Sequence, residues 1–455
     1  MAVKTALLFP GPGAYLPGVL APFAEPDTAA HEALQAIDAV AEKHSWGKVS
    51  SVLTSPADAT TPSRPESLWL GFYATSIVMS DALEAAGVEC DTLVGHSGGE
   101  ISALTVAGSL SVADGARVLV ERVLALSRAS QSDGTMMVVS AAAHRAEALC
   151  QAVGDASLAL AVDNTPRQSV VCGRRDAIIK LEELAVGLGW ETTRLAMPYM
   201  LHNPLLAGAA EDFLDAIADV RVRAPRRSVY SPLLGRLVLT AADAREVLEC
   251  HLVRPVRFRD ALSVLYREGT ERFIECGARR VLTDLVAATL PAEARALAIL
   301  DHRNDASGLA KLMTSFLSSS EVEPAPVVVA PEPAARNSVA EQTGATSAPA
   351  EGTLVDEQTS SASAPAHPAL PVDDETLHEQ LMETYAAVLQ YPADVFTRDA
   401  DLEGDLGVSS IKQTEIFARL LDRYDLPTPS SDTRVSAYRT LGQIGDLLRS
   451  LAAAA

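Results

Sequence analysis

The feature that most constrains the fold is a serine set among glycines directly after an apolar run. Leu93 and Val94 precede the segment Gly95-His96-Ser97-Gly98-Gly99. Glycines two residues before and two after the serine permit a sharp turn from a strand into a helix. Ser97 would then stand at a helix N-terminus, where free N–H groups favour a developing oxyanion. For such a motif alone, an ordinary glycine-rich loop before a helix is the alternative.

Length and charge limit the other possibilities. The chain has 455 residues, 48% of them hydrophobic, which predicts two or more folded units. Its formal net charge of -22 would repel nucleic acids and anionic membranes, so we expect neither as a partner. Basic protein surfaces remain suitable partners.

Cysteine usage and the N-terminus indicate a cytoplasmic protein without a metal. The five cysteines are scattered and form no C-x-x-C pair, which favours neither a zinc site nor a disulfide framework. The apolar run before Gly11 is too short for a signal peptide or a membrane span.

The first body, residues 1–318, has an α/β pattern with an insert. Strands are expected at 6–9 and 92–94, and helices at 68–86, 99–107 and 113–127. Residues 133–198 then follow a β-α-β-β-α-β order, which predicts a small ferredoxin-like subdomain.

A linker and a small helical domain complete the chain. Residues 319–372 are rich in Ala, Pro, Ser and Glu and contain no aromatic residue, which predicts a flexible tether. Residues 373–455 return to helical patterning and predict an acidic bundle of three to four helices. Its apolar positions include Leu377, Leu381, Tyr385, Ile416, Leu420, Leu441, Ile444 and Leu448.

Several ordered motifs of the first body resemble the malonyl-CoA:acyl carrier protein transacylases and the acyltransferase domains of polyketide synthases. The segment Phe9-Pro10-Gly11-Pro12-Gly13 is similar to their F-P-G-Q-G loop, and Gly95 to Glu100 matches their G-H-S-x-G-E elbow. Arg122 falls at their arginine position, and His202-Asn203-Pro204-Leu205 is similar to their second catalytic segment. The resemblance implies an acyltransferase fold, with an α/β-hydrolase-like large subdomain and the inserted small one.

By this resemblance, Ser97 is the nucleophile and His202 the base that accepts its proton. Arg122 would hold the free carboxylate of a malonyl-type acyl group, because a guanidinium binds a carboxylate in a bidentate manner. The alternatives are a structural histidine in a helix cap and a surface arginine whose stem covers apolar residues.

The oxyanion hole departs from the family pattern. Gly98 would give one N–H, but Pro12 replaces the glutamine that gives the second, and proline has no N–H. Unless Gly13 takes over, losing one donor costs about 3 kcal/mol of barrier. We therefore expect slow turnover or a long-lived acyl-enzyme.

Three further residues are assigned to the site. Tyr199 and Leu201 would line the acyl pocket, where a bulky Leu201 favours malonyl over larger groups. His251 stands where the family tends to carry glutamine, and we expect its backbone carbonyl to orient His202.

The C-terminal bundle resembles an acyl carrier protein. The segment Leu406-Gly407-Val408-Ser409-Ser410-Ile411 is similar to the L-G-x-D-S-L motif, whose serine receives 4′-phosphopantetheine. Ser410 is the matching position, although Ser409 replaces the aspartate, and a helix N-cap is its structural alternative.

Together these motifs predict a ping-pong acyltransferase for polyketide or fatty acid biosynthesis. It would take malonyl-CoA or a related carboxyacyl-CoA and load an acyl carrier protein in cis or in trans. A phosphopantetheinyl transferase and a ketosynthase or polyketide synthase are the expected partners. The alternatives are an acyl-thioester hydrolase, an acyltransferase for non-carboxylated groups, and a weakened enzyme that serves as a carrier or docking scaffold.

Overall fold

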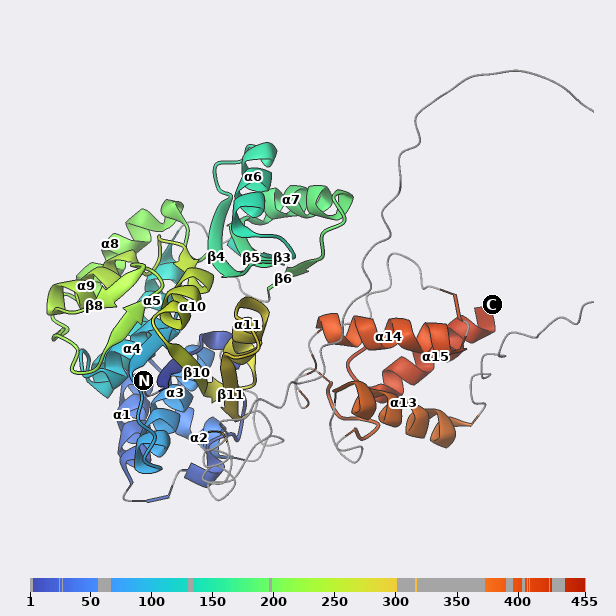
Figure 1. The fold of residues 1–455 in the computed structure, drawn as a ribbon, viewed down its shortest axis with the longest axis horizontal. Coiled ribbons are helices and arrows are strands. Elements are labelled where there is room, and N and C mark those ends of the chain that lie inside the picture. Colours follow the sequence, from blue (N-terminus) through green and yellow to red (C-terminus); the bar gives the residue numbers. More distant parts are fainter. Residues whose placement is uncertain are drawn as a thin grey trace, which may run out of the picture. The chain divides into compact units, whose positions relative to one another are not determined.

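The computed structural model shows two units, residues 1–327 and 328–455 (Figure 1). In the first unit it describes residues 3–300, with gaps at 24, 27, 56–66, 130–133 and 196–198, together with Phe316. In the second it describes 373–454, with gaps at 390–395, 403–405, 407, 409, 425 and 428–437. The predicted tether at 319–372 lies outside the described residues.

The large subdomain is built on a six-stranded sheet of order β11-β10-β1-β2-β7-β8. All neighbouring strands are parallel except β7 and β8. Strand β1 lies inside the sheet and is buried from Thr5 onward, and its last four residues are all apolar, as expected of a parallel strand covered on both faces. The strands are β1 (Lys4–Phe9), β2 (Thr92–Gly95), β7 (Val229–Ser231), β8 (Arg236–Val238), β10 (Thr270–Ala278) and β11 (Arg295–Leu300).

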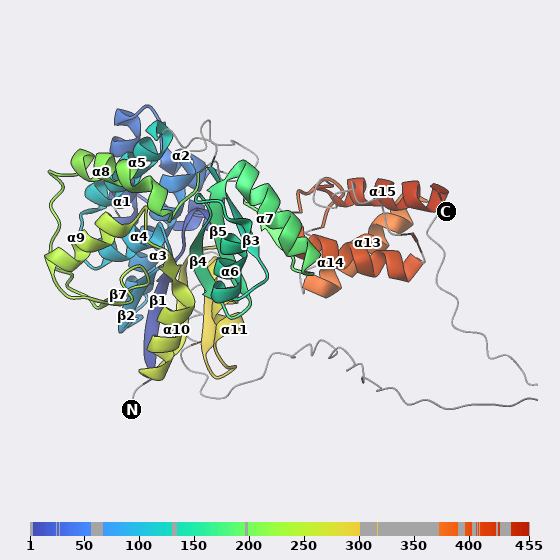
Figure 2. The same cartoon turned by 90° about the horizontal axis from the view of Figure 1, so that it is seen from above.

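Helices pack around this sheet (Figures 1 and 2). Helix α3 (Ser67–Ala85) is apolar on nearly all sides and lies in the interior, whereas α5 (Val112–Arg128) is amphipathic and begins at the Ser111 N-cap. The others are α1 (Ala29–Lys43), α2 (Val49–Thr54), α4 (Gly99–Val106), α8 (Ala207–Ala216), α9 (Ala241–Cys250), α10 (Phe258–Arg267) and α11 (Val281–Thr289). The short 3-10 helices are η1 (Pro12–Ala14), η2 (Ala21–Phe23) and η3 (Pro204–Leu206).

The small subdomain has the predicted β-α-β-β-α-β order and a ferredoxin-like strand arrangement. Its sheet has the order β6-β3-β5-β4-β9, and the first four strands pair antiparallel. A fifth strand, β9 (Val256–Arg257), comes from a later part of the chain and pairs parallel with β4. The other elements are β3 (Gly134–Val139), α6 (Ala143–Val153), β4 (Ala159–Thr165), β5 (Gln168–Arg174), α7 (Arg175–Gly187) and β6 (Thr192–Arg194).

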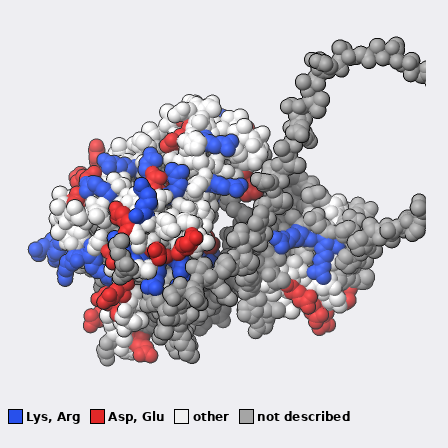
Figure 3. Space-filling model, viewed as in Figure 1, with Lys and Arg blue, Asp and Glu red and all other residues white. Residues whose placement is uncertain are grey.

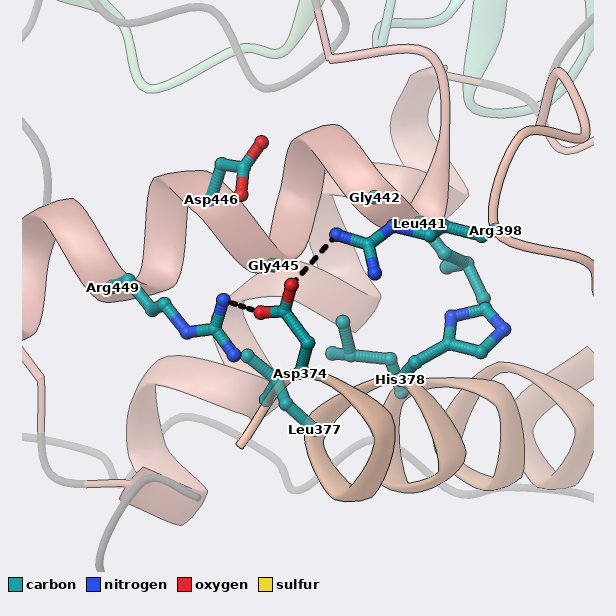
Figure 4. Close-up of a pocket in the computed structure, with 10 residues that line it drawn as sticks. Asp374, Leu377, His378, Arg398, Leu441, Gly442, Gly445, Asp446 and Arg449 are labelled. Atoms are coloured by element: carbon teal, nitrogen blue, oxygen red, sulfur yellow. Dashed lines mark hydrogen bonds and ion pairs between the residues drawn. The ribbon is translucent and has the colours of Figure 1, made fainter. Parts of the chain in front are cut away.

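The second unit is the predicted helical bundle, with α13 (Asp374–Leu389), α14 (Ser410–Tyr424) and α15 (Leu441–Ala454). Its buried core is formed by the apolar positions of these helices together with Phe396, Leu402 and Val408. Figure 4 shows Asp374, at the start of α13, paired with both Arg398 and Arg449. These ion pairs connect the start of α13 to the loop after it and to α15.

Candidate active site

The turn that carries Ser97 depends on two glycines with no room for a side chain. Strand β2 ends at Gly95 and α4 begins at Gly99. A Cβ on Gly95 would lie 2.2 Å from the Glu100 nitrogen, and one on Gly99 would lie 1.8 Å from the Phe9 carbonyl oxygen. Ser97 has a φ of 53°, in the left-handed region that non-glycine residues rarely adopt. The glycines therefore hold Ser97 in a strained turn at the end of β2.

The side chains of Ser97 and His202 share a hydrogen bond. Ser97 Oγ lies 2.7 Å from His202 Nε2, and His202 Nδ1 lies 2.9 Å from the Arg254 carbonyl oxygen. Because that carbonyl can only accept, we assign the proton to Nδ1, which leaves Nε2 free to accept from the serine. His202 also has a positive φ, of 58°.

Burial keeps this imidazole neutral. His202 is 1% exposed, and desolvation, followed by the positive charge of Arg122, lowers its pKa to about 3. A neutral imidazole paired to a hydroxyl is the arrangement that a general base requires.

Arg122 is fully buried on α5, and it forms no ion pair with an acidic side chain in the part of the chain that the structure describes. Its Nε donates to His251 Nδ1 at 2.9 Å, and its guanidinium carbon lies 4.7 Å from the centre of the Trp69 ring. Within the described residues, Nη1 and Nη2 have no hydrogen-bond partner. Desolvation lowers the pKa of Arg122 to about 9, which leaves the group charged at neutral pH. A buried cation with two free donors is suited to a carboxylate ligand.

The expectation for the His251 backbone carbonyl was wrong. The carbonyl of Arg254, three residues later, holds His202 instead. The side chain of His251 has another position: it accepts from Arg122, and its Nε2 lies 3.1 Å from the Ser97 carbonyl oxygen. His251 thus links the guanidinium to the turn that carries Ser97.

The Pro12 loop lies against the same turn. A Cβ on Gly11 would lie 3.4 Å from the His96 carbonyl oxygen and 3.8 Å from the Gly98 nitrogen. Pro12 opens η1 directly after Gly11, and Gly13 within η1 faces open space. Gly98 is covered by the Phe72 ring.

Residues of the expected acyl pocket lie in the core. Leu201 is 3% exposed, and Tyr199 is partly buried against the same core. Met200, which stands between Tyr199 and Leu201 in the sequence, packs so closely on Gly134 that a Cβ built there would meet its backbone and its side chain. Ser410 is the first residue of α14, and its side chain lies outside the described part of the structure.

Sequence reasoning missed two side chains near the site. Trp69 lies in an apolar helix, where its sequence context predicts only a core residue. Asn164 Oδ1 accepts a hydrogen bond of 2.8 Å from His96 Nε2, which ties β4 of the small subdomain to the turn. No sequence pattern distinguishes Asn164 from other polar residues near the end of a buried strand.

On the face in Figure 3, basic and acidic side chains are interspersed. Arg236 forms ion pairs with both Asp243 and Glu246. Within the described residues, no group of three His, Cys, Asp or Glu side chains is arranged to hold a metal ion. Among the described helices, none combines the length and the apolar character needed to cross a bilayer.

Two family models match the chain. Residues 7–322 match the acyl transferase domain, and residues 379–448 match the phosphopantetheine attachment site. The chain is 30% identical over 315 residues to the spectinabilin polyketide synthase system protein NorA' of Streptomyces orinoci. It is 30% identical over 328 residues to the phenolphthiocerol synthesis polyketide synthase type I Pks15/1 of Mycobacterium marinum. Each match covers 69% of this chain but 9% and 15% of those relatives.

Solved structures have the same fold. The acyltransferase domain from module 8 of the salinomycin polyketide synthase is 28% identical, with a TM-score of 0.63 over 71% of this chain and 78% of that one. The malonyl CoA-acyl carrier protein transacylase of Coxiella burnetii is 21% identical, with a TM-score of 0.61 over 70% of this chain and all of that one, which shows likeness of fold.

Fold and turn define the first unit as an α/β acyltransferase. The chain belongs to the acyl transferase domain family and carries a C-terminal phosphopantetheine attachment domain. It is thus an acyltransferase joined to a carrier domain.

Proposed function

We propose that the first unit transfers a malonyl-type acyl group from coenzyme A, through Ser97, to the thiol of an acyl carrier protein. The observation that carries this proposal is the buried guanidinium of Arg122, whose Nη1 and Nη2 have no partner among the described residues. One imidazole, that of His251, separates it from the backbone of Ser97. A substrate that carries both a carboxylate and a thioester fits this arrangement.

In the first half-reaction, His202 Nε2 accepts the proton of Ser97 as Oγ attacks the thioester carbonyl carbon. The Gly98 N–H stabilises the oxyanion that forms. The intermediate collapses as the carbon–sulfur bond breaks, and His202 gives its proton to the leaving thiolate. The product is an acyl ester of Ser97 and free coenzyme A.

In the second half-reaction, His202 accepts the proton of an acceptor thiol, which attacks the Ser97 ester. The ester bond breaks, and His202 returns the proton to Ser97 Oγ. Phosphopantetheine supplies this thiol when bound to a carrier, and we assign its attachment to Ser410. A position at the start of the 15-residue helix α14 fits the phosphate, because the helix N-terminus favours an anion. A carrier in the same chain raises the effective thiol concentration, which favours self-loading over loading in trans.

Two residues would set rate and acyl size. Pro12 follows Gly11, which lies beside the turn, and it cannot give the second N–H of an oxyanion hole, so we expect turnover slowed by roughly two orders of magnitude. Buried Leu201 limits the space for substituents and favours malonyl over bulkier groups. A ketosynthase of a polyketide or fatty acid pathway would use the loaded carrier.

Intact-protein mass spectrometry tests this proposal. The full chain, coexpressed with a broad phosphopantetheinyl transferase, is incubated with malonyl-CoA, methylmalonyl-CoA or acetyl-CoA. We expect a malonyl adduct on Ser97 and a second one on the arm of Ser410. Ser97→Ala should abolish both adducts, whereas Ser410→Ala should keep the first. An arm without any acyl adduct on Ser97 would support the scaffold alternative, and release of free malonate at the rate of acylation would support the hydrolase.

A further inference from the structure

Like His202, His251 is a buried histidine with both ring nitrogens in contact with groups of the candidate site. Nδ1 accepts from Arg122 Nε at 2.9 Å, and Nε2 lies 3.1 Å from the Ser97 carbonyl oxygen. Arg122 can only donate and the carbonyl can only accept, so these two partners select a neutral imidazole with its proton on Nε2. The ring is completely buried, which also favours the neutral form.

This contact determines which edge of Arg122 is available. With Nε engaged by His251, and one face of the guanidinium covered by Trp69, the free donors are Nη1 and Nη2. These two nitrogens form the fork that binds a carboxylate through two parallel hydrogen bonds. The guanidinium is therefore held on one edge and one face before any ligand arrives.

The neutrality of His251 has a second consequence. A glutamate at this position would pair with Arg122 and cancel its charge, whereas an imidazole accepts the hydrogen bond and leaves the charge uncancelled. The positive charge then remains for the substrate. Leaving it buried without an anion is unfavourable, so an acyl group that brings a carboxylate gains more than a neutral one.

We propose that His251 is a positioning residue for acyl selection: it fixes the Nη1–Nη2 fork of Arg122 relative to Ser97 while leaving the charge of the guanidinium free for a carboxylated acyl group. One ring spans both contacts, so it sets the distance between the carboxylate site and the attacking hydroxyl. This inference rests on the proposed function and names the residue that enforces its substrate class.

Three substitutions at this position separate its two properties. His251→Gln keeps an acceptor and a donor without charge, His251→Leu removes both, and His251→Glu adds a competing anion. The measurement is the single-turnover rate of Ser97 acylation by malonyl-CoA and by acetyl-CoA, over a range of concentrations that separates affinity from rate. His144→Leu, on the exposed side of α6, is the matched control.

We expect His251→Leu to lower the malonyl to acetyl ratio of acylation at least tenfold. His251→Glu should lower it further, and His251→Gln should restore it to within about threefold of the parent. His251→Leu should mainly weaken the affinity for malonyl-CoA, because the Nη1–Nη2 fork that binds the carboxylate is no longer fixed. A loss of fold would lower both acylation rates together and leave their ratio unchanged. The control His144→Leu should also leave the ratio unchanged.

An unchanged ratio in His251→Leu, with acylation still measurable, would overturn the role assigned to His251. The same result in His251→Glu would show that Arg122 is not the carboxylate site. If the parent chain forms no malonyl adduct on Ser97, the proposed function itself fails, and this outcome is separate from the other two.

Discussion

Two buried ionisable groups, Glu100 and Arg122, belong to the surroundings of the Ser97 turn and differ in their hydrogen-bond partners. Glu100, in the first turn of α4, accepts hydrogen bonds from the Ser231 hydroxyl at 2.6 Å and the Leu233 N–H at 2.9 Å. Arg122 on α5 donates to one histidine and leaves two nitrogens without partners among the described residues. The carboxyl group of Glu100 thus has partners on both oxygens, whereas the guanidinium of Arg122 keeps two donors for a ligand.

This difference separates a structural role from a binding role. Burial raises the pKa of Glu100 to about 8, so its carboxyl is largely protonated at neutral pH and needs no counter-charge. Arg122 keeps its charge, and no described acidic group neutralises it. Unpaired buried charge is costly, so its presence near Ser97 supports the proposed ligand of opposite charge.

The largest expected effect comes from removing the guanidinium of Arg122. Arg122→Leu should reduce malonyl acylation of Ser97 by roughly 10²- to 10⁴-fold, because a buried carboxylate would lose its charged partner. Stability should stay equal or rise, since an uncompensated charge leaves the core. Acylation rates and urea denaturation followed by tryptophan fluorescence measure both, because Trp46, Trp69 and Trp190 all belong to the first unit. Marked destabilisation would mean that Arg122 has a structural role.

A smaller effect is expected at Glu100, where the free energy of unfolding should depend on pH. The folded state keeps the Glu100 proton between pH 4.5 and about 8, whereas the unfolded chain releases it, so this group makes the parent less stable as pH rises through that window. Glu100→Gln has no such dependence. Relative to the parent, the variant should gain about 1–3 kcal/mol of unfolding free energy from pH 5 to pH 8. A difference independent of pH would contradict the raised pKa.

The positive charge of Arg122 should also affect the pKa of His202. Because the pKa of His202 is lowered to about 3 by burial and by Arg122, its base form persists below the usual histidine range. Acylation of the parent should therefore change less than about threefold between pH 5.5 and 7. In Arg122→Leu the acid limb should move to higher pH, measured with acetyl-CoA. A parent limb near pH 6.5 would show that His202 is solvated.

The smallest effect is expected from an arginine on the opposite face of α5. Arg117 forms a two-pronged ion pair with exposed Asp219, 2.7 Å on each arm. Such a surface pair is screened by salt and water. Arg117→Ala should leave both the urea midpoint and the malonyl to acetyl ratio within experimental error. A change in that ratio would mean that any charge on α5 influences the site.

Much of the fold was predictable because it follows local patterns. The apolar runs of β1 and β2, the glycines around Ser97 and the alternation of the insert predicted the α/β body and the ferredoxin-like subdomain, which the structure confirms. Strand β9 was not predictable, since two residues carry no periodicity and their pairing with β4 is decided by tertiary contacts.

For the site, the motifs predicted that Ser97 and His202 meet, and the structure places their side chains 2.7 Å apart, 105 residues from each other along the chain. Their chemical roles remain predictions for the experiments above. The sequence did not indicate which carbonyl holds His202, or that Trp69 covers Arg122. Both depend on the backbone path of segments that are distant in sequence, and neither has a residue pattern of its own.

The short pairing of β9 with β4 has a consequence for the motion of the small subdomain. Val256 and Arg257 follow the Arg254 carbonyl that holds His202, and they pair with Val162 and Asp163 of the small subdomain. Asn164, next in β4, holds His96. A rotation of the small subdomain away from the large one would displace β9, and with it the Arg254 carbonyl that orients the His202 imidazole. We therefore expect the small subdomain and the segment that orients His202 to move together rather than independently.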